Sequence, residues 1–556
     1  MNSDIEIARQ ADIRPIVDIA SNLGIPEEYV ETYGKHKAKV NLKINSDSEI
    51  AGQNNGKLIL VSAMTPTTAG EGKTTTTVGL TDAMALLGHS VVTCMREPSL
   101  GPCFGMKGGG AGGGMSQVIP MEDINLHFNG DFHAITSAHN LIAAILDNHL
   151  HHGNKLNIDP RRIIWQRVLD VNDRALRQVV LGLGGPLNSV PRQDSFSITA
   201  ASEIMAIFCL SNDFQELRKN IDAIIVAYNF NNNPVTVSDL KVTGALMALL
   251  KDAIKPNLVQ TLEGNPVFVH GGPFGNIAHG CSSVIGDRIA LNYAEYVLTE
   301  AGFGADLGFE KFIHIKSRLS NLDPHAVVLV ATIKGLKYHG GVKVKELDQE
   351  NTSALTKGLS NLRHLIEVIK SFGLPVIVAI NEFPNDTPSE IKIVQKGAIE
   401  AGASAAVSNT SFVDGGSGCK ELAEAVIDIT PDSPVKINYA YELSDSIEDK
   451  VLAVSKLVYN ASDVNWSPKS RRIVRRYTEL GWSNTPICMA KTPLSISHNS
   501  KLKGKPENYT FEVNDIRASM GAGFTYPIAG NIVTMPGLPS RPRSLDVDKY
   551  GNILGL

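Results

Sequence analysis

The sequence predicts an α/β protein built on a doubly wound, mostly parallel sheet. Short apolar runs of strand length recur along the chain, helical segments separate several of them, and most runs end in polar or glycine-rich loops. In such folds ligands bind beyond the carboxyl ends of the strands, so these loops are the first place to look for a site. The runs are 57–63, 90–94, 222–229, 266–276, 326–335, 375–386 and 403–412.

Taken in order, residues 1–50 have the character of polar amphipathic helices, with the clearest apolar stripe at 13–24. The buried-strand pattern of 57–63 follows, and Thr65-Pro66 ends it. Residues 78–88 repeat apolar side chains at helical spacing up to Gly88, and a second strand is expected at 90–94. Strand, glycine loop, helix and strand form a βαβ unit, with which a parallel sheet begins.

The length of 556 residues exceeds what one hydrophobic core supports, so several domains are expected. We predict a phosphate-loop (P-loop) nucleotide-binding domain with N-terminal helices at 1–305 and a second α/β domain at 306–430. From about residue 432 helices come first and shorter strands rich in Gly and Pro follow, which predicts a C-terminal α+β domain at 431–556.

Composition excludes several classes of protein. The net charge of −5 is small for this length and argues against nucleic acid or an anionic membrane as a partner. No apolar run reaches the roughly 18 residues that span a bilayer. The six cysteines lie far apart without a CxxC pair, which argues against disulfides and zinc and for a reducing compartment. With no signal-peptide pattern at the N-terminus, a cytoplasmic protein is expected.

The stretch TPTTAGEGKTTTT at 65–77 resembles the phosphate loop GxxxxGK[ST], with Thr67 at the first glycine position. Gly70 and Gly72 allow backbone N–H groups to converge on an anion at the start of a helix. Lys73 is expected to reach the β- and γ-phosphates, and Thr74 to ligate Mg²⁺. The alternative is an ordinary βα turn with a surface lysine. The predicted phosphate-binding residues are Thr67, Ala69, Gly70, Glu71, Gly72, Lys73, Thr74 and Thr75.

A metal-bound phosphate also needs an acid near the end of a neighbouring strand. Glu97, Asp131 and Asp170 are the candidates, with helix caps or surface salt bridges as the alternative. Arg96 precedes a run of seven glycines within 104–114, which is either a linker or a loop packed close to a ligand. A guanidinium here would hold a second anion, such as a carboxylate or acyl phosphate, against the γ-phosphate. Lys73, Arg96, Glu97 and Asp131 are therefore the catalytic candidates.

With these residues in view, the chain resembles the formate–tetrahydrofolate ligase family. The resemblance runs from about residue 10 to the C-terminus, with its motifs in the family's order. Those motifs are TPTTAGEGKTTTT, MREPSLGPCFG (95–105), KGGGAGGG (107–114), MEDINLHFNGDFHA (121–134), HNLIAAILDNHL (139–150), EAGFGADLGFEKF (300–312), NEFPNDT (381–387), PICMAKTPLS (486–495) and GNIVTMPGLPSRP (530–542).

The resemblance implies an ATP-dependent ligation that gives 10-formyltetrahydrofolate. Formate attacks the γ-phosphate of MgATP to give formyl phosphate and ADP, and N10 of tetrahydrofolate then displaces phosphate. It also implies that Arg96 holds formyl phosphate, that a monovalent cation (K⁺ or NH₄⁺) activates the enzyme, and that four copies assemble as a homotetramer. Without the pattern of a fused dehydrogenase or cyclohydrolase module, a monofunctional ligase of the bacterial type is expected.

The resemblance places the folate between aromatic rings. Phe383 occupies one ring position, Asn381 and Pro384 line the same loop, and Phe412 stands where the family has a Trp. Phe in place of Trp keeps a stacking face but reduces its area. Glu382 stands where the family often has a basic residue, so a charge contact with the glutamate tail of a polyglutamate substrate is in doubt on that side.

Two questions stay open at this point. The basic stretch KSRRIVRRY at 469–477 has helical spacing and is a solvated face, a subunit contact or a polyglutamate contact. A phosphate-loop ATPase that switches between protein partners is the rival function. That rival gives no role to Phe383, Phe412 or the long C-terminal region.

Overall fold

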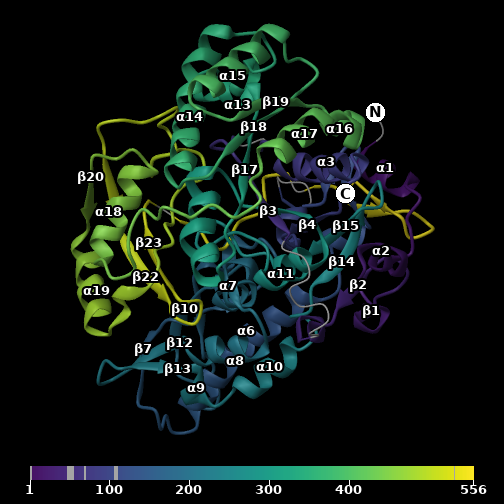
Figure 1. Ribbon diagram of the computed structural model, residues 1–556. Helices are drawn as coiled ribbons and strands as arrows, with labels where there is room; N and C mark the ends of the chain where they lie inside the picture. The colour runs from purple at the N-terminus through teal and green to yellow at the C-terminus, as the bar shows by residue number, and fades with distance from the viewer. Residues whose placement is uncertain are drawn as a thin grey trace.

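A computed structural model describes residues 3–46, 56–67, 70–105, 110–530, 532–541 and 543–555. A 12-stranded sheet forms the centre of this part of the chain, in the order β1-β2-β14-β15-β4-β16-β3-β17-β18-β19 with β5 and β6 beside β14 (Figure 1). The strands are β1 (Val30–Thr32), β2 (Ala38–Val40), β3 (Lys57–Ala63), β4 (Val91–Met95), β5 (Gly112–Gly113), β6 (Ser116–Ile119), β14 (Asn257–Thr261), β15 (Pro266–Val269), β16 (Tyr296–Glu300), β17 (Ala326–Ala331), β18 (Val376–Asn381) and β19 (Ala405–Asn409).

The strands from β15 to β19 in this order all run parallel to their neighbours. β14, β2 and β1 extend one edge in antiparallel pairing. The apolar runs at 57–63, 90–94, 266–276, 326–335, 375–386 and 403–412 each supply one of the parallel strands. The predicted α/β class, with a parallel-rich central sheet, is confirmed.

Helices cover both faces of the sheet. Alternate residues of β3 enter two different cores, Leu58 and Leu60 in one and Ile59, Val61 and Ala63 in the other. Because successive strand residues point to opposite faces, a strand buried on both sides reads as one continuous apolar run. The principal covering helices are α3 (Lys73–Leu86), α11 (Val284–Tyr293), α13 (Ile333–His339), α14 (Thr352–Ser371), α15 (Pro388–Glu400) and α17 (Lys420–Ile429).

One predicted strand belongs elsewhere. The run at 222–229 becomes β12 (Ile225–Asn229), which pairs with β7 (Ile158–Ile163) and β13 (Pro234–Thr236) in a separate antiparallel sheet. A short apolar run predicts burial but does not specify which sheet receives the strand. This sheet and the helices α6 (Asp131–His151), α7 (Glu203–Leu210), α8 (Phe214–Asp222), α9 (Val237–Leu240) and α10 (Thr243–Leu250) form the lower part of Figure 1.

The N-terminal region is only partly helical. α1 (Asp4–Gln10) and α2 (Ile16–Leu23) fit the prediction, and α2 buries the stripe expected at 13–24. Residues 30–32 and 38–40 are strands instead, and β2 pairs with β14 at the sheet edge. The expectation of helices throughout 1–50 is therefore wrong here, because three-residue strands are too short to show a period of two.

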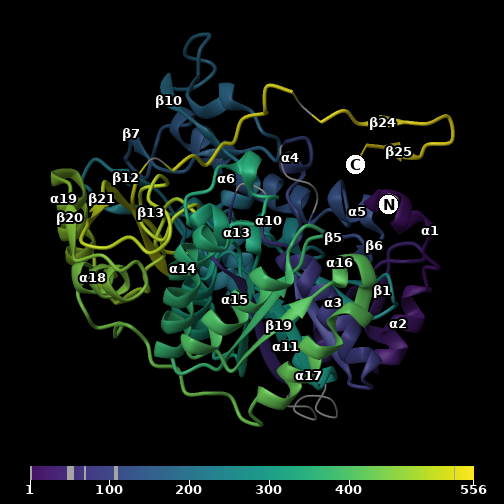
Figure 2. The ribbon, with the colours of Figure 1, turned by 90° about the horizontal axis from the view of Figure 1, so that it is seen from above.

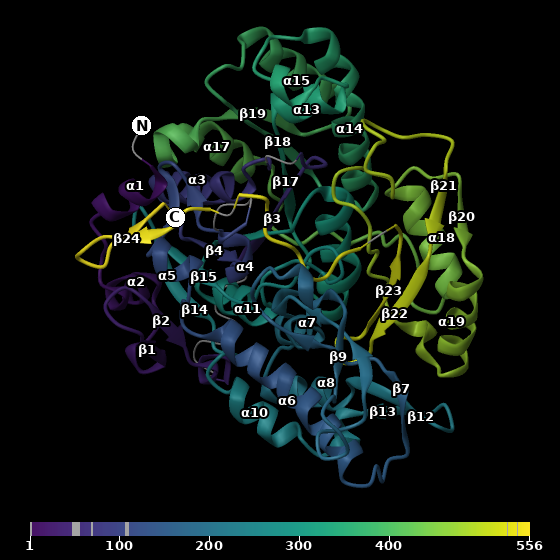
Figure 3. The same ribbon diagram turned by 180° about the vertical axis from the view of Figure 1, so that it is seen from behind.

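The C-terminal region begins with α18 (Ile447–Leu457), β20 (Asp463–Trp466) and α19 (Pro468–Glu479), and continues with β21 (Thr510–Val513), β22 (Asp515–Ser519) and β23 (Phe524–Ile528). Figure 3 shows these elements at one side of the central sheet, with β22 and β23 facing β7 and β12. The chain then returns across the molecule to a terminal hairpin of β24 (Asp546–Val547) and β25 (Ile553–Leu554) near α1 (Figure 2).

Strands from both sides of residue 305 contribute to the central sheet, since β3 pairs with β16 and with β17. The divisions at 305/306 and 430/431 stay predictions. In the described part of the chain, no helix is long and apolar enough to cross a membrane.

Candidate active site at the carboxyl edge of the sheet

The loop between β3 and α3 lies at the carboxyl edge of the parallel strands. Gly70 and Gly72 have φ of +83° and +73°, a region that L side chains rarely adopt. A Cβ on Gly72 would lie 2.3 Å from Asn381 Nδ2, so a larger residue does not fit there. Ala69, also expected at the phosphates, lies outside the described residues.

Glu71 holds this loop together. Its Oε1 accepts a hydrogen bond from the Thr67 N–H at 2.7 Å, and its Oε2 accepts one from the Thr332 hydroxyl. Burial raises the pKa of Glu71 above its usual value, against the lowering effect of these hydrogen bonds. The side chain of Glu71 thus ties the phosphate loop to Thr332, directly after β17.

The first turn of α3 is fixed by neighbouring strands. Thr74 Oγ1 lies 3.3 Å from Glu300 Oε2 at the end of β16, and Thr76 Oγ1 accepts a hydrogen bond from Asn409 at 3.0 Å at the end of β19. Glu300 is 5% exposed, and its Oε1 has no hydrogen-bond partner among the described residues. Sequence reasoning missed Glu300, although an acid at the end of the apolar run YVLTE signals a strand-end carboxylate.

Glu97, just after β4, lies close to Asp131 at the start of α6. Burial raises the pKa of Glu97 well above its usual value, and the Asp131 carboxylate adds to this effect. Glu97 Oε2 is buried without a hydrogen-bond partner in the described structure. Asp131 is held by the buried Lys39 and by Asn257, each at 2.7 Å. The two acids therefore differ, because Asp131 forms an ion pair with Lys39, whereas Glu97 forms none with the described residues.

Asp170, the third acid considered, caps a short helix. Its carboxylate accepts hydrogen bonds from the Ser99 hydroxyl at 2.5 Å and from the Leu100 N–H at 2.9 Å. Both donors stand at the start of α4 (Leu100–Cys103). Asp170 therefore caps a helix, which was the alternative to a role at a metal-bound phosphate.

Arg96 follows β4 and lies against the loop 270–280. Its Nη1 donates to the Pro273 carbonyl at 3.4 Å, and its buried Nε has no partner among the described residues. His279 in the same loop is fully buried, and neither of its ring nitrogens has a described partner. Burial and nearby positive charges lower the pKa of His279 well below its usual value, so the ring is neutral. Donors without partners in a buried space mark a place for a polar ligand.

The predicted folate loop follows β18. Asn381 Nδ2 donates to the Glu71 carbonyl at 3.3 Å, which joins this loop to the phosphate loop. Phe383 is half-buried with Lys334 Nζ 4.8 Å from its ring centroid, a cation–π arrangement. Pro384 is exposed. The asparagine and the phenylalanine are thus brought to the same edge as the start of α3.

Phe412 lies on the short helix α16 (Ser411–Asp414), directly after β19, and is 41% exposed. Its carbonyl accepts a hydrogen bond from the Met115 N–H at 2.9 Å. A Cβ on Gly114 would lie 2.0 Å from the same carbonyl oxygen, so the described end of the glycine run packs against Phe412. No ring contact joins Phe383 and Phe412, both of which are described, but each follows one of two adjacent parallel strands.

A buried ion pair links the C-terminal region to this edge. Lys491 Nζ lies 2.5 Å from Asp306 Oδ2, and both side chains are inaccessible to solvent. Asp306 Oδ1 accepts a hydrogen bond from the Thr65 hydroxyl at 3.2 Å, at the start of the phosphate loop. Neither charged residue stood out from the sequence, because the pairing joins positions 185 residues apart.

Known proteins resemble this chain over its whole length. The family model described as "Formate--tetrahydrofolate ligase" matches residues 2–556. A protein named formate–tetrahydrofolate ligase from Bacillus pumilus (strain SAFR-032) is 51% identical over 556 residues, covering 100% of this chain and 99% of the relative. The chain belongs to the formate–tetrahydrofolate ligase family. Membership in the formate–tetrahydrofolate ligases confirms the resemblance and decides against the partner-switching ATPase.

Proposed function

We propose that the protein performs its family's reaction through formyl phosphate, with the chemistry at the carboxyl edge of the sheet. As a family member it ligates formate to tetrahydrofolate at the expense of ATP. The observation that supports this site is the convergence of the α3 N-terminus, Arg96 and the loops after β18 and β19 on one edge.

The phosphates of ATP are proposed to lie at the start of α3. This helix has 14 residues, and its N-terminus presents backbone N–H groups and a partial positive charge. Thr67, Gly70, Glu71, Gly72, Lys73, Thr74 and Thr75 are the binding residues we propose, together with Ala69. The left-handed backbone at Gly70 and Gly72 suits an anion-binding loop.

Mg²⁺ enters with ATP as part of the substrate. A hydroxyl and a carboxylate are oxygen donors of the kind that Mg²⁺ prefers, and Thr74 and Glu300 supply this pair 3.3 Å apart. The orphaned Oε1 of Glu300 fits a cation or a metal-bound water. We therefore add Glu300 to Thr74 as a proposed Mg²⁺ residue.

Arg96 is proposed to hold the formyl phosphate. A guanidinium provides paired donors for an acyl phosphate, and exclusion of water protects that reactive anhydride from hydrolysis. Lys73 acts on the transferred phosphoryl group. Glu97 and Asp131 are proposed as positioning residues behind Arg96, with the Lys39–Asp131 pair fixing the helix α6 that carries one of them.

Tetrahydrofolate is proposed to bind beyond β18 and β19. The exposed ring of Phe412 offers one stacking face, and Phe383, Asn381 and Pro384 line the neighbouring loop. This arrangement brings N10 toward the formyl carbon held near Arg96. Nucleophilic attack there forms the C–N bond, and phosphate leaves with the oxygen that formate contributed.

Two experiments test this proposal. Incubation with MgATP, formate and tetrahydrofolate, followed by acidification, should produce the absorbance of methenyltetrahydrofolate only when formate is present. Labelled [¹⁸O]formate should then transfer one ¹⁸O atom to inorganic phosphate, because its oxygen attacks the γ-phosphorus. Unlabelled phosphate would contradict the formyl phosphate intermediate while leaving the ligase activity intact.

Three properties stay proposals from the family resemblance: a homotetramer, activation by a monovalent cation (K⁺ or NH₄⁺), and a cytoplasmic location. All six cysteines are free and buried, which supports a reducing compartment. Sedimentation at catalytic concentration and rates with K⁺ in place of tetramethylammonium test the first two.

A further inference from the structure

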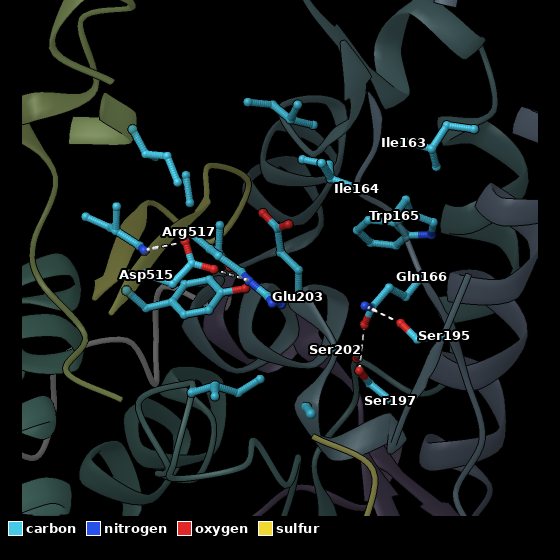
Figure 4. Close-up of a pocket in the computed structure, with 18 of the residues that line it drawn as sticks. Ile163, Ile164, Trp165, Gln166, Ser195, Ser197, Ser202, Glu203, Asp515 and Arg517 are labelled. Atoms are coloured by element: carbon cyan, nitrogen blue, oxygen red, sulfur yellow. Dashed lines mark hydrogen bonds and ion pairs between the residues drawn. The ribbon is translucent and has the colours of Figure 1, made fainter. Parts of the chain in front are cut away.

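A cleft of about 810 Å³ opens between the β7–β12 sheet and the C-terminal region. One wall comes from β7, the segment leading to β8 (Arg167–Val168) and the start of α7, and the other from α19, β22 and β23 (Figure 4). The volume lies in the range of small-molecule sites. None of the residues assigned above to ATP, formyl phosphate or folate lines it.

The lining is positively charged. Six basic side chains face three acidic ones, which leaves an excess of three positive charges in a protein whose net charge is −5. The basic residues are Arg161, Arg162, Lys469, Arg472, Arg476 and Arg517. Asp159 and Glu479, outside the lining, pair with Arg161 at 2.8 Å and with Arg476 at 3.1 Å. The positive charge that remains is on Arg162, Arg472 and Arg517, and it attracts anions.

Two of these guanidinium groups lack close acidic partners. Arg472 is exposed and makes no hydrogen bond or ion pair with any described residue. The nearest ion-pair atom to Arg517 is Asp515 Oδ2 at 3.9 Å, and that carboxylate is bound more closely by Lys469 at 2.8 Å. Both groups therefore keep donors available to a ligand.

The acids in the cleft do not cancel this charge. Asp194 lies 3.3 Å from each of two arginines outside the lining. Glu203 Oε1 accepts a hydrogen bond from the Gly521 N–H at 2.8 Å, and burial raises the pKa of Glu203 to about 8. Burial therefore favours the neutral form of Glu203, whose hydroxyl is a hydrogen-bond donor.

The remaining lining suits the uncharged part of an organic ligand. Ile164 is 48% exposed and Tyr228, Ile473 and Tyr526 are half-buried, so these side chains present apolar and aromatic surface to the cleft, whereas Trp165 beneath them is 5% exposed. The side-chain amide of Gln166 donates a hydrogen bond to the Ser195 hydroxyl and accepts one from the Ser197 hydroxyl. This wall therefore carries both hydrogen-bond donors and acceptors. Figure 4 shows Glu203 and Arg517 projecting into the space that faces Trp165 and Gln166.

We propose that this cleft binds a small organic anion of nucleotide size, with a phosphate or carboxylate group on a planar or apolar body. The guanidinium groups of Arg472 and Arg517 hold the anionic group, since their forked donors match either oxyanion. The exposed faces of Ile164, Tyr228 and Tyr526 contact the planar or apolar part of the molecule. The basic stretch at 469–477 lies on α19, which forms one wall of the cleft. The proposed anion is therefore a ligand of this stretch.

The test uses the intact protein saturated with Mg²⁺ and a non-hydrolysable ATP analogue, so that the phosphate loop is occupied. Uridine monophosphate, phthalate and inorganic phosphate are titrated by calorimetry and by tryptophan emission. We expect one molecule of uridine monophosphate or phthalate per chain, with inorganic phosphate at least about tenfold weaker because it lacks the body. The tighter of the two organic probes assigns the anion as phosphate or carboxylate.

Substitutions locate the binding. Arg472→Gln with Arg517→Gln should raise the dissociation constant at least about tenfold. Arg475→Gln is the matched control, since Arg475 is an exposed arginine on the same helix that lines a different hollow. Trp165→Phe should abolish the emission change while binding persists. Absence of binding by both organic probes, or an equal loss in Arg475→Gln, would overturn the proposal.

Discussion

Thr74 Oγ1 lies 3.3 Å from Glu300 Oε2, across the boundary between α3 and β16. Thr74 lies in the first turn of the helix that follows β3. Glu300 is the last residue of β16, the strand that pairs with β3. Parallel neighbours bring their carboxyl ends to one edge, which is why residues 226 positions apart meet. This pair defines where we expect Mg²⁺ to enter with ATP.

Glu300→Gln should raise the Mg²⁺ concentration for half-maximal activity about tenfold or more, since a neutral amide replaces a charged oxygen ligand. Initial rates at fixed ATP and varied Mg²⁺ measure this. Glu295→Gln, at the exposed residue directly before β16, is the control and should leave the Mg²⁺ requirement unchanged. An unaltered requirement in Glu300→Gln would remove this residue from the metal site.

Arg96→Lys should lower kcat/KM for formate about a hundredfold, because a single ammonium cannot replace the paired donors of the guanidinium. The KM for ATP should stay near the wild-type value. Rates at varied formate separate the two constants. The exposed Arg471→Lys serves as the control. A loss confined to ATP binding would contradict the role proposed for Arg96.

Phe412→Ala should raise the KM for tetrahydrofolate about tenfold, the loss expected for one stacking face, with kcat and the KM for ATP little changed. Because the ring is 41% exposed, thermal stability should also change little. Phe412→Trp should match or improve on the wild-type KM. Phe214→Ala, at a similarly exposed ring of 38%, is the control and should not affect the KM for tetrahydrofolate.

Lys491→Met should destabilise the protein by about 3–5 kcal/mol, because it leaves the Asp306 carboxylate buried without its cation. The melting temperature measures the effect, and the double variant with Asp306→Leu should recover part of the loss. Arg363 pairs with Glu400 on the surface, with side chains 42% and 50% exposed. Arg363→Met should therefore cost less than about 1 kcal/mol. Equal losses in the two single variants would refute the buried-pair argument.

Asp82 on α3 makes stability depend on pH. Burial raises its pKa from 3.8 to about 7, against hydrogen bonds from Thr261 and Asn265 that lower it. Between about pH 4 and pH 7 the folded state holds a proton that the unfolded state has lost. The contribution of Asp82 to the free energy of unfolding therefore falls as pH rises through this range and stays constant above pH 7. Its upper bound is about 4 kcal/mol. Asp82→Asn should reduce the difference in melting temperature between pH 5 and pH 8; an unchanged difference would contradict it.

The sequence predicts those parts of the fold that depend on a local pattern of apolar residues. Each strand of the parallel block except β16 appeared as an apolar run, because a strand covered on both faces needs consecutive apolar residues. β1 and β2 were missed, since three-residue edge strands carry no period. β12 was recognised as a strand but placed in the wrong sheet, because the sequence segments that form its partners β7 and β13 were not recognised as strands.

By itself, the sequence determined the α/β class, the phosphate-loop pattern at 65–77 and the family, because these depend on residue type and local spacing. Only the tertiary structure decided which distant side chains meet. Three examples join residues that no local pattern connects: Glu300 with Thr74, Lys491 with Asp306, and α19 with Trp165 in the lining of one cleft. The physical reason is that strand order and helix packing bring these groups together only after the chain has folded.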